Sequence, residues 1–192
     1  MRVGETIPPG GPPATERALA RLVEARAVVL VEGLSDQLAL EAVARRRRLD
    51  LAPAGVAILP IGGAHAVGRF VERLAHLRLA GLCDAQEAGI FRGALDAPAV
   101  HVCTADLEDE LLRAHGVEAV ESLLRRNGDL AAFRTFQKQP AWRGRPADDQ
   151  LRRFLTSADR RKMRYATILA ATAEQVPAPL TAVLDYAAGP LV

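Results

Sequence analysis

Short aliphatic runs alternate with longer amphipathic stretches in the first half of the chain. The aliphatic runs show no polar alternation, and they lie at Ala27–Val31, Val56–Pro60, Leu79–Cys83 and Ala99–Cys103. Runs of this length and composition are typical of strands that are covered on both faces. The stretches between them have helical spacing of apolar residues, which predicts helices over about 36–48, 64–77 and 86–95.

This alternation predicts the fold class. Strands and helices that follow each other through short connections favour a mostly parallel sheet with helices on both faces. After residue 106 we expect helices only, over 107–115, 117–126, 129–137, 148–155, 160–171 and 180–187. The pattern therefore predicts an α/β fold in which a four-stranded, mostly parallel sheet is flanked by helices and followed by a C-terminal helical extension.

The domain boundaries follow from the same pattern. Residues 1–14 contain Pro8-Pro9-Gly10-Gly11-Pro12-Pro13, and we expect them to be a disordered tail. Thr15 is expected to cap a short helix that ends near Ala25. The α/β domain is expected to span 15–115, and the helical extension that completes it 116–192.

Composition narrows the class of protein. The chain has 192 residues, of which 49% are hydrophobic and 25% charged, as in ordinary globular proteins. No apolar run approaches the roughly 18 residues of a membrane helix, and no secretory signal is visible. Cys83 and Cys103 are too few for a multi-cysteine zinc site, and we expect both to be small buried residues in a cytoplasmic protein.

Basic residues are clustered although the net charge is only +2. One block is Arg45–Arg48 and another is Arg160–Arg164. Local clusters of this kind can bind a polyanion, and the alternative is a solvated helix face. In the second block, Arg160, Arg161 and Arg164 are candidate nucleic-acid contacts.

Acidic residues follow three of the predicted strands. Glu32, Asp84 and Asp106 come at or shortly after the strand ends, where open parallel sheets bind ligands. A carboxylate at the end of a buried strand is costly unless a cation pairs with it. Asp36, Glu87 and Glu108 lie nearby in the sequence, although acids at helix starts such as Asp36 and Glu108 can equally serve as caps. Hard oxygen ligands of this kind suit Mg²⁺ or Mn²⁺.

Such an acidic rim can support phosphodiester chemistry. Two ions a few ångströms apart can activate a water and stabilise the leaving oxygen, so no Ser–His pair is required. Lys162 can stabilise charge on phosphorus, and the alternative is an ordinary surface lysine. Gly62 and Gly63 permit a close backbone approach to nucleic acid or simply a tight turn. No phosphate-binding loop motif is present.

Together these residues resemble a TOPRIM domain, and they are most similar to the C-terminal TOPRIM region of OLD (overcoming lysogenization defect) family nucleases. The matching segments are 29–36, 59–63, Asp84 after the third strand, 106–111 and, more weakly, 162–166. The resemblance implies a TOPRIM/Rossmann-like fold and a Mg²⁺-dependent nuclease or nucleotidyl-transfer site for DNA. It implies that Glu32 is a metal ligand or general acid/base and that Asp84 is the first acid of a D-x-D motif. It also implies that Asp36 and Glu108 are further ligands and that Lys162 lies near the scissile phosphate.

The chain departs from the family pattern in two respects. Gln86 stands where the second acid of the D-x-D motif is expected, with Glu87 next to it. OLD proteins also carry an ATPase domain before the TOPRIM region, and none is visible here, so we expect a stand-alone form, a partner of a separate ATPase or a degenerate binding module.

Three functions remain open at this point. The first is a metal-dependent DNA-cleaving enzyme, and the second is a non-catalytic module that binds nucleic acid or a partner protein. The third is a phosphatase or nucleotidyl transferase that acts on a small nucleotide. The pattern does not distinguish DNA from RNA and does not indicate an oligomeric state.

Overall fold

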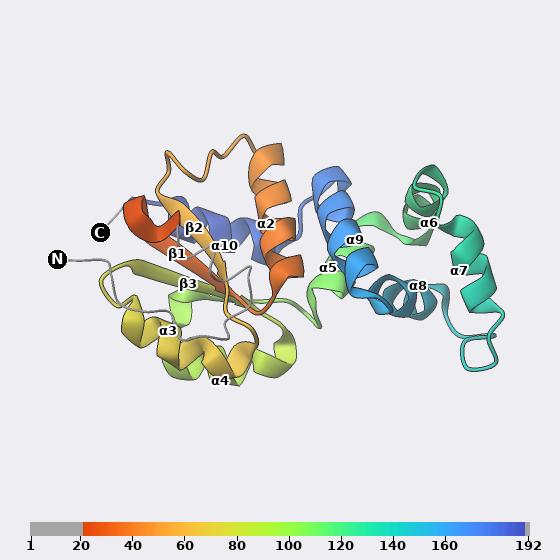
Figure 1. The fold of residues 1–192 in the computed structure, drawn as a ribbon, viewed down its shortest axis with the longest axis horizontal. Coiled ribbons are helices and arrows are strands. Elements are labelled where there is room, and N and C mark those ends of the chain that lie inside the picture. The colour runs from red at the N-terminus through yellow and green to blue at the C-terminus, as the bar shows by residue number, and fades with distance from the viewer. Residues whose placement is uncertain (1–20, 191–192) are drawn as a thin grey trace.

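The computed structural model describes residues 21–190, and its centre is a parallel four-stranded sheet (Figure 1). The strand order is β2-β1-β3-β4, and every neighbouring pair is parallel. The strands are β1 (Ala27–Val31), β2 (Val56–Pro60), β3 (Arg78–Cys83) and β4 (Val100–Val102). The expected fold class is confirmed. The predicted tail over 1–14 and the start of the helix predicted at Thr15 lie outside the described residues.

Helices and short 3₁₀ turns connect and follow the strands. The turns are η1 (Arg21–Glu24), η2 (Ala64–Ala66), η3 (Ala85–Glu87) and η4 (Ala97–Ala99). The helices are α2 (Leu34–Arg46), α3 (Val67–Arg73), α4 (Ala88–Ala94), α5 (Leu107–His115), α6 (Val117–Arg126), α7 (Leu130–Gln137), α8 (Ala147–Thr156), α9 (Asp159–Thr172) and α10 (Ala178–Ala188). The helix predicted over 64–77 is thus shorter, because a 3₁₀ turn replaces its start and Arg73 is its last helical residue.

Alternate residues of β1 pack into two separate hydrophobic cores, one on each face of the sheet. Val29 and Val31 of β1 pack with α2, α9 and α10, whereas Val28 and Leu30 pack with α3 and α4 on the other face. All four side chains are fully buried. This two-sided burial explains why the strand sequence has no polar alternation.

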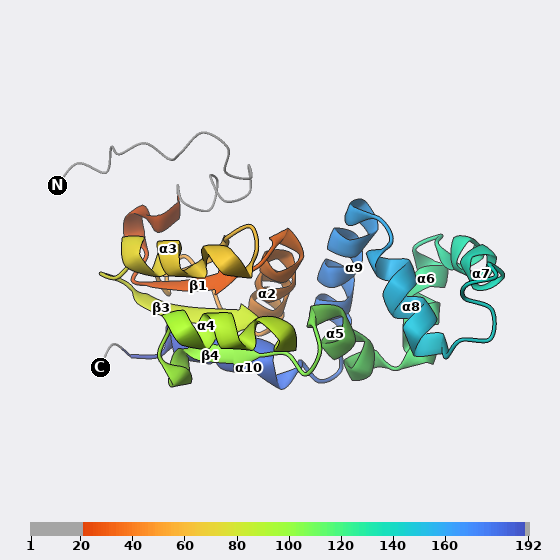
Figure 2. The same ribbon diagram turned by 90° about the horizontal axis from the view of Figure 1, so that it is seen from below.

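The last helix returns to the sheet after a long helical excursion. The chain leaves β4, forms α5 to α9, and then places α10 against β1, β3 and β4. Helices α6, α7 and α8 lie beyond α5 and α9, at the end of the molecule farthest from α3 (Figures 1 and 2). The carboxyl ends of the strands point toward α5 and α9, so these two helices separate the sheet from the outer helices.

The four-arginine block helps to hold this arrangement. Arg46 donates to the carbonyl oxygens of Ala171 and Glu174, which end and follow α9. Arg47 donates to Asp185 of α10 at 2.7 Å. These two arginines therefore connect the end of α2 to the end of α9 and to α10. The sequence had suggested either a polyanion-binding cluster or a solvated helix face for this block.

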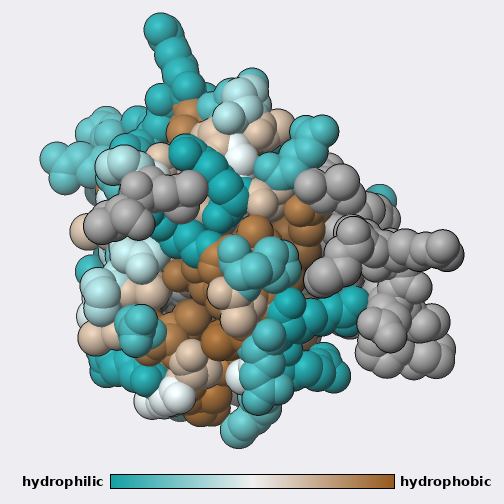
Figure 3. All heavy atoms as spheres, turned by 90° about the vertical axis from the view of Figure 1, so that its left-hand side faces the viewer, coloured by the Kyte–Doolittle hydropathy of each residue, from teal (hydrophilic) through white to brown (hydrophobic). Residues whose placement is uncertain are grey.

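The end of the molecule that lies farthest from α6, α7 and α8 has an apolar patch on its surface. Figure 3 shows apolar residues gathered in the middle of this end, at the amino ends of the strands, with hydrophilic residues around them. None of the helices within residues 21–190 is long and apolar enough to cross a membrane.

Gly81 of β3 offers a test of how tightly the sheet packs on α4. A Cβ atom at this position would lie 2.5 Å from Cδ1 of Phe91, a fully buried residue. We expect Gly81→Val to lower the free energy of unfolding by about 3 kcal/mol, because overpacking forces the ring out of place. Gly89→Ala is the control, since its Cβ would meet no atom within 4 Å and alanine favours the helix. Urea unfolding of both variants measures the difference, and equal stabilities would contradict this packing.

Candidate metal centre

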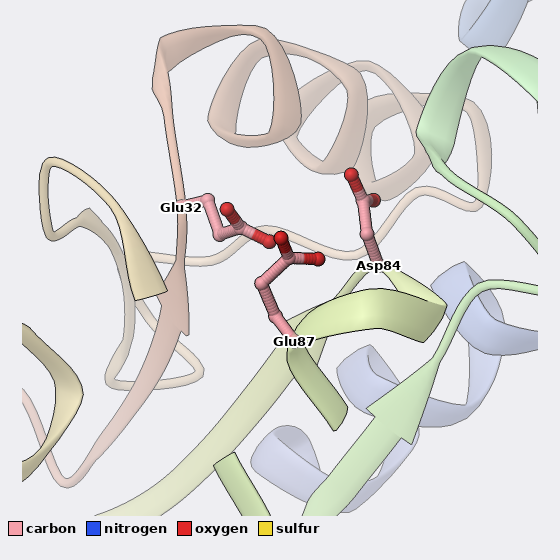
Figure 4. A group of neighbouring side chains, drawn as sticks. All are labelled: Glu32, Asp84 and Glu87. Carbon is pink, nitrogen blue, oxygen red and sulfur yellow. The ribbon is translucent and has the colours of Figure 1, made fainter. Parts of the chain in front are cut away.

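Three carboxylates converge beyond the carboxyl ends of β1 and β3 (Figure 4). Glu32 directly follows β1, Asp84 directly follows β3, and Glu87 ends the turn η3. Each offers one oxygen, and these oxygens lie within 4.8 Å of one another. Because β1 and β3 are parallel neighbours, their carboxyl ends bring Glu32 and Asp84 to one place.

The glycine pair after β2 holds the backbone of Glu32. The N–H groups of Gly62 and Gly63 both donate to the carbonyl oxygen of Glu32, at 3.0 and 3.1 Å. Both glycines have positive φ angles, 81° and 112°, which glycine adopts without strain. Their N–H groups are therefore occupied, and the pair positions Glu32 instead of presenting free donors to a phosphate.

Glu87 lies where the sequence suggested a missing acid. The N–H of Glu87 donates to the carbonyl oxygen of Asp84 at 3.1 Å, which closes one 3₁₀ turn. Side chains three residues apart eclipse each other in such a turn, so Glu87 lies beside Asp84 while Gln86 is exposed. The segment after β3 thus contributes a second carboxylate besides that of Asp84, one residue later than the D-x-D motif would place it.

One oxygen of Glu87 indicates that the group suits a cation. Within residues 21–190, Oε2 of Glu87 is buried and has no hydrogen-bond partner. A buried carboxylate oxygen without a partner is costly, and a divalent ion with oxygen ligands would remove that cost. The three carboxylates therefore fit Mg²⁺ or Mn²⁺.

A second set of charged side chains lies next to the first. Asp36 is in the first turn of α2 and accepts a hydrogen bond from the N–H of Gly33 at 2.9 Å. The N-cap residue of α2 is thus Gly33, and Asp36 takes part in the cap from the third helical position. Glu108 is buried in the first turn of α5, and Nζ of Lys162 lies 3.5 Å from its Oε1. Helix α9 therefore brings Lys162 into the acidic region.

Asp106 has a different environment. It caps α5 by accepting a hydrogen bond from the N–H of Asp109 at 2.8 Å, and its other oxygen contacts the guanidinium of Arg152. Both of its oxygens thus have protein partners, and it does not belong to the group of Glu32, Asp84 and Glu87. Arg152 was not among the residues predicted from the sequence, because it lies 46 positions from Asp106 and belongs to no motif.

Burial and mutual repulsion raise the pKa values of these acids. Burial raises the pKa of Asp84 to about 7, and the charges of Asp36 and Glu32 add to the effect. Burial also raises the pKa of Asp36 to about 7 against the opposing hydrogen bond from Gly33. The pKa values of Glu32 and Glu108 are raised as well, chiefly by burial. The region therefore carries negative charge that is costly near neutral pH unless a cation is bound.

Lys162 responds to these acids in the opposite sense. Burial alone would lower its pKa, but the carboxylates of Glu108 and Asp36 outweigh burial, and the net change is upward. Lys162 therefore stays positively charged at neutral pH, as a contact to a phosphate requires.

The other predicted basic residues divide into two kinds. Arg161 donates to the carbonyl oxygen of Phe154 at 3.1 Å and stacks over its ring, which ties α9 to α8. Arg164 donates to Asp129 at 2.9 Å and to Asn127, which ties α9 to the turn before α7. Arg160 is exposed, and no side-chain hydrogen bond or ion pair forms at it within the described residues. Among the described residues, Arg160 is thus the one of these three arginines whose guanidinium has no protein partner.

The raised pKa of Asp84 predicts how stability depends on pH. Its ordinary value is 3.8, so the unfolded chain loses the proton at lower pH than the folded chain does. In EDTA, ionisation of Asp84 should therefore lower the free energy of unfolding progressively as the pH rises from 4 to about 7. Above that range the full loss of stability should be present. We expect Asp84→Asn to raise the melting temperature at pH 8 more than at pH 5. Thermal unfolding of both proteins at the two pH values measures this, and an equal shift at both would contradict it.

Part of the sequence matches a protein-family model, and the fold is similar to solved structures. Residues 25–83 match the model of the overcoming lysogenization defect protein-like TOPRIM domain. The fold is similar to the C-terminal region of the Burkholderia pseudomallei OLD protein, with a TM-score of 0.62, 18% identity and coverage of 84% of this chain and 96% of that one. It is also similar to the C-terminal region of the Xanthomonas campestris pv. campestris OLD protein, with a TM-score of 0.61, 21% identity and coverage of 86% and 96%. No curated protein sequence matches.

Proposed function

We propose that this chain, which carries a TOPRIM domain of the OLD-like family, is the catalytic part of a divalent-metal-dependent enzyme that cleaves phosphodiester bonds in DNA. A TOPRIM domain of this family implies a metal-dependent function related to nucleic acids. The observation that supports the finer proposal is the convergence of Glu32, Asp84 and Glu87 within 4.8 Å, next to a charged lysine.

Each side chain has a proposed role. Glu32, Asp84 and Glu87 would hold one Mg²⁺ or Mn²⁺ ion, and Asp36 and Glu108 are the proposed ligands of a second. When bound, such ions supply positive charge at the phosphodiester and lower the pKa of water. Lys162 is proposed to contact the phosphate at the scissile bond, because its ammonium group is charged and its side chain is 39% exposed. For Asp106 we propose that the helix cap and the contact with Arg152 replace the predicted role as a ligand.

The biological setting is proposed from the same resemblance. A separate ATPase is the proposed partner, because OLD proteins combine the two activities. A cytoplasmic location is proposed as well, and Cys83 and Cys103 are free and buried, as a reducing compartment permits.

Metal binding and DNA cleavage can be tested on the unmodified protein. Calorimetric titration with Mn²⁺ should show binding, and supercoiled plasmid should be nicked or linearised with Mg²⁺ or Mn²⁺ but not with EDTA. Activity on mononucleotides without any on plasmid would overturn the proposal in favour of a small-nucleotide enzyme. Cleavage that persists in EDTA would overturn the metal dependence.

The alternative is a DNA-binding module that does not cleave. The observation in its favour is Gln86, a neutral amide where the family motif has an acid. In that case we expect DNA binding that weakens with added salt but no Mn²⁺ heat and no cleavage.

A further inference from the structure

A cleft along α8 adjoins the acidic region and differs from it in composition. One of its lining residues is Asp106, at the carboxyl edge of the sheet, and most of the others lie on one face of α8 or in the loop before it. The residues that carry the argument are Trp142, Arg145, Asp149, Arg152 and Arg153. Helix α8 contacts α5 and α9 as well as α6 and α7, so the cleft lies along a helix that joins the outer helices to the two helices next to the sheet.

Trp142 is held as a rigid platform in this cleft. Its ring stacks on Phe136 with a centroid distance of 5.2 Å and an interplanar angle of 29°. Its carbonyl oxygen accepts a hydrogen bond of 2.8 Å from Gln150, a buried residue that also accepts a hydrogen bond from Gln137. The ring nevertheless remains partly exposed where it lines the cleft. A fixed aromatic ring that is open on one side is suited to stack an unpaired base.

Two arginines of the cleft have guanidinium groups without a partner in the part of the chain that the structure describes. Arg145 and Arg153 are exposed, and within residues 21–190 neither side chain makes a hydrogen bond or ion pair. The third arginine, Arg152, is neutralised by Asp106. Asp149 offsets part of the charge, but three arginines face two aspartates, so the cleft is positive overall. Free guanidinium groups beside an aromatic platform match the phosphates and bases of a nucleic-acid strand.

We propose that this cleft, which we call the Trp142 cleft, binds an unpaired segment of a DNA strand beside the cleavage site. One base stacks on Trp142, and the flanking phosphates contact Arg145 and Arg153. The stretch from Asp149 to Thr156 rises about 10 Å along the helix axis, which is about the length of three stacked nucleotides. This inference rests on the proposed function and narrows its substrate to DNA with frayed, flapped or single-stranded segments.

Binding can be followed by tryptophan fluorescence under conditions that prevent metal-dependent cleavage. Because Trp142 is the only tryptophan of the chain, this fluorescence reports on the cleft. In EDTA, the fluorescence of the intact protein is titrated with a deoxythymidine oligonucleotide of about ten nucleotides and with a duplex of the same length. The single strand is expected to quench the fluorescence, and the duplex to quench it much less. No quenching by either, or equal quenching by both, would overturn the proposal.

Paired variants connect the quenching to the two arginines. Arg145→Gln/Arg153→Gln should weaken single-strand binding about tenfold or more. The slope of the logarithm of the binding constant against the logarithm of the salt concentration should fall by the equivalent of about two phosphate contacts. Arg125→Gln/Arg126→Gln removes the same charge from exposed positions of α6 outside the cleft, and it should bind within about twofold of the unmodified protein. Equal losses in both variants would overturn the proposal in favour of general charge attraction.

A third variant tests the stacking itself. Trp142→Leu should weaken binding of a labelled oligonucleotide, measured by fluorescence anisotropy, with circular dichroism to confirm that the helices remain. Trp142→Phe should restore part of the affinity because it keeps an aromatic face, and equal affinities of the two variants would contradict stacking. The outcomes separate the two proposals: quenching without any cleavage refutes the proposed function only, and cleavage without quenching refutes the Trp142 cleft only.

Discussion

Glu32→Gln is expected to lower the rate of metal-dependent DNA cleavage by about 10³-fold, equivalent to about 4 kcal/mol of activation free energy. The substitution keeps the size of the side chain and removes the charge that we propose to hold the ion. Mn²⁺ affinity should fall in the same variant. Because burial and the charge of Glu87 already raise the pKa of Glu32, removing its charge should not destabilise the metal-free fold. Plasmid cleavage, calorimetry and thermal unfolding measure these three effects.

Glu72→Gln is the matched control for this experiment. Glu72 is an exposed residue of α3, so the same chemical change there should leave cleavage within about twofold of the unmodified protein. Full activity in Glu32→Gln would show that the metal centre is assigned to the wrong residues. A loss of activity together with a collapse of the melting temperature would show that Glu32 acts through the fold.

Glu87→Gln is expected to lower cleavage by about 10²-fold, whereas Gln86→Ala should change it by less than about twofold. The reason is the 3₁₀ turn after β3, in which Glu87 lies beside Asp84 and Gln86 faces solvent. Oε2 of Glu87, which is buried and has no hydrogen-bond partner among residues 21–190, belongs to the carboxylate whose charge would be lost. Cleavage rates and Mn²⁺ affinities of the two variants provide the measurement.

A swapped variant makes this prediction sharper. Gln86→Glu/Glu87→Gln restores the spacing of the family motif, but the new carboxylate would point to solvent if the turn is kept. We therefore expect the swap to be as inactive as Glu87→Gln alone. Restored activity would mean that the chain after β3 adopts the extended form in which residues two apart share one face.

The strands could be predicted almost residue by residue. The bounds of β1 and β2 match those expected from the aliphatic runs, and β3 begins one residue earlier than expected. The reason is that β1 and β2 are buried along their whole length, so every position in them is apolar. The half-buried β4 is shorter than the expected Ala99–Cys103 and carries a histidine at its centre. The helix predicted over 64–77 was less accurate, because periodicity alone does not show that a 3₁₀ turn replaces the first helical turn.

The candidate site was only partly visible in the sequence. Acids that follow neighbouring parallel strands had to meet at one edge, so Glu32 and Asp84 could be paired from the pattern alone. Glu87 could be named as a neighbour of Gln86, but its direction depends on the turn that contains it. Asp106 looked equivalent to the other acids until the structure placed Arg152 against it.

The sequence by itself determined the strands, the order of the elements and the edge at which acids accumulate, because these follow from local apolar patterns and from the geometry of parallel sheets. Only the tertiary structure decided which charges meet. Lys162 lies 54 positions from Glu108 and reaches it because α9 packs against α2 and α5. The Trp142 cleft likewise depends on contacts between α8 and the loop before it. Partners that are distant in the chain leave no periodic signal, since their contact depends on the packing of whole helices.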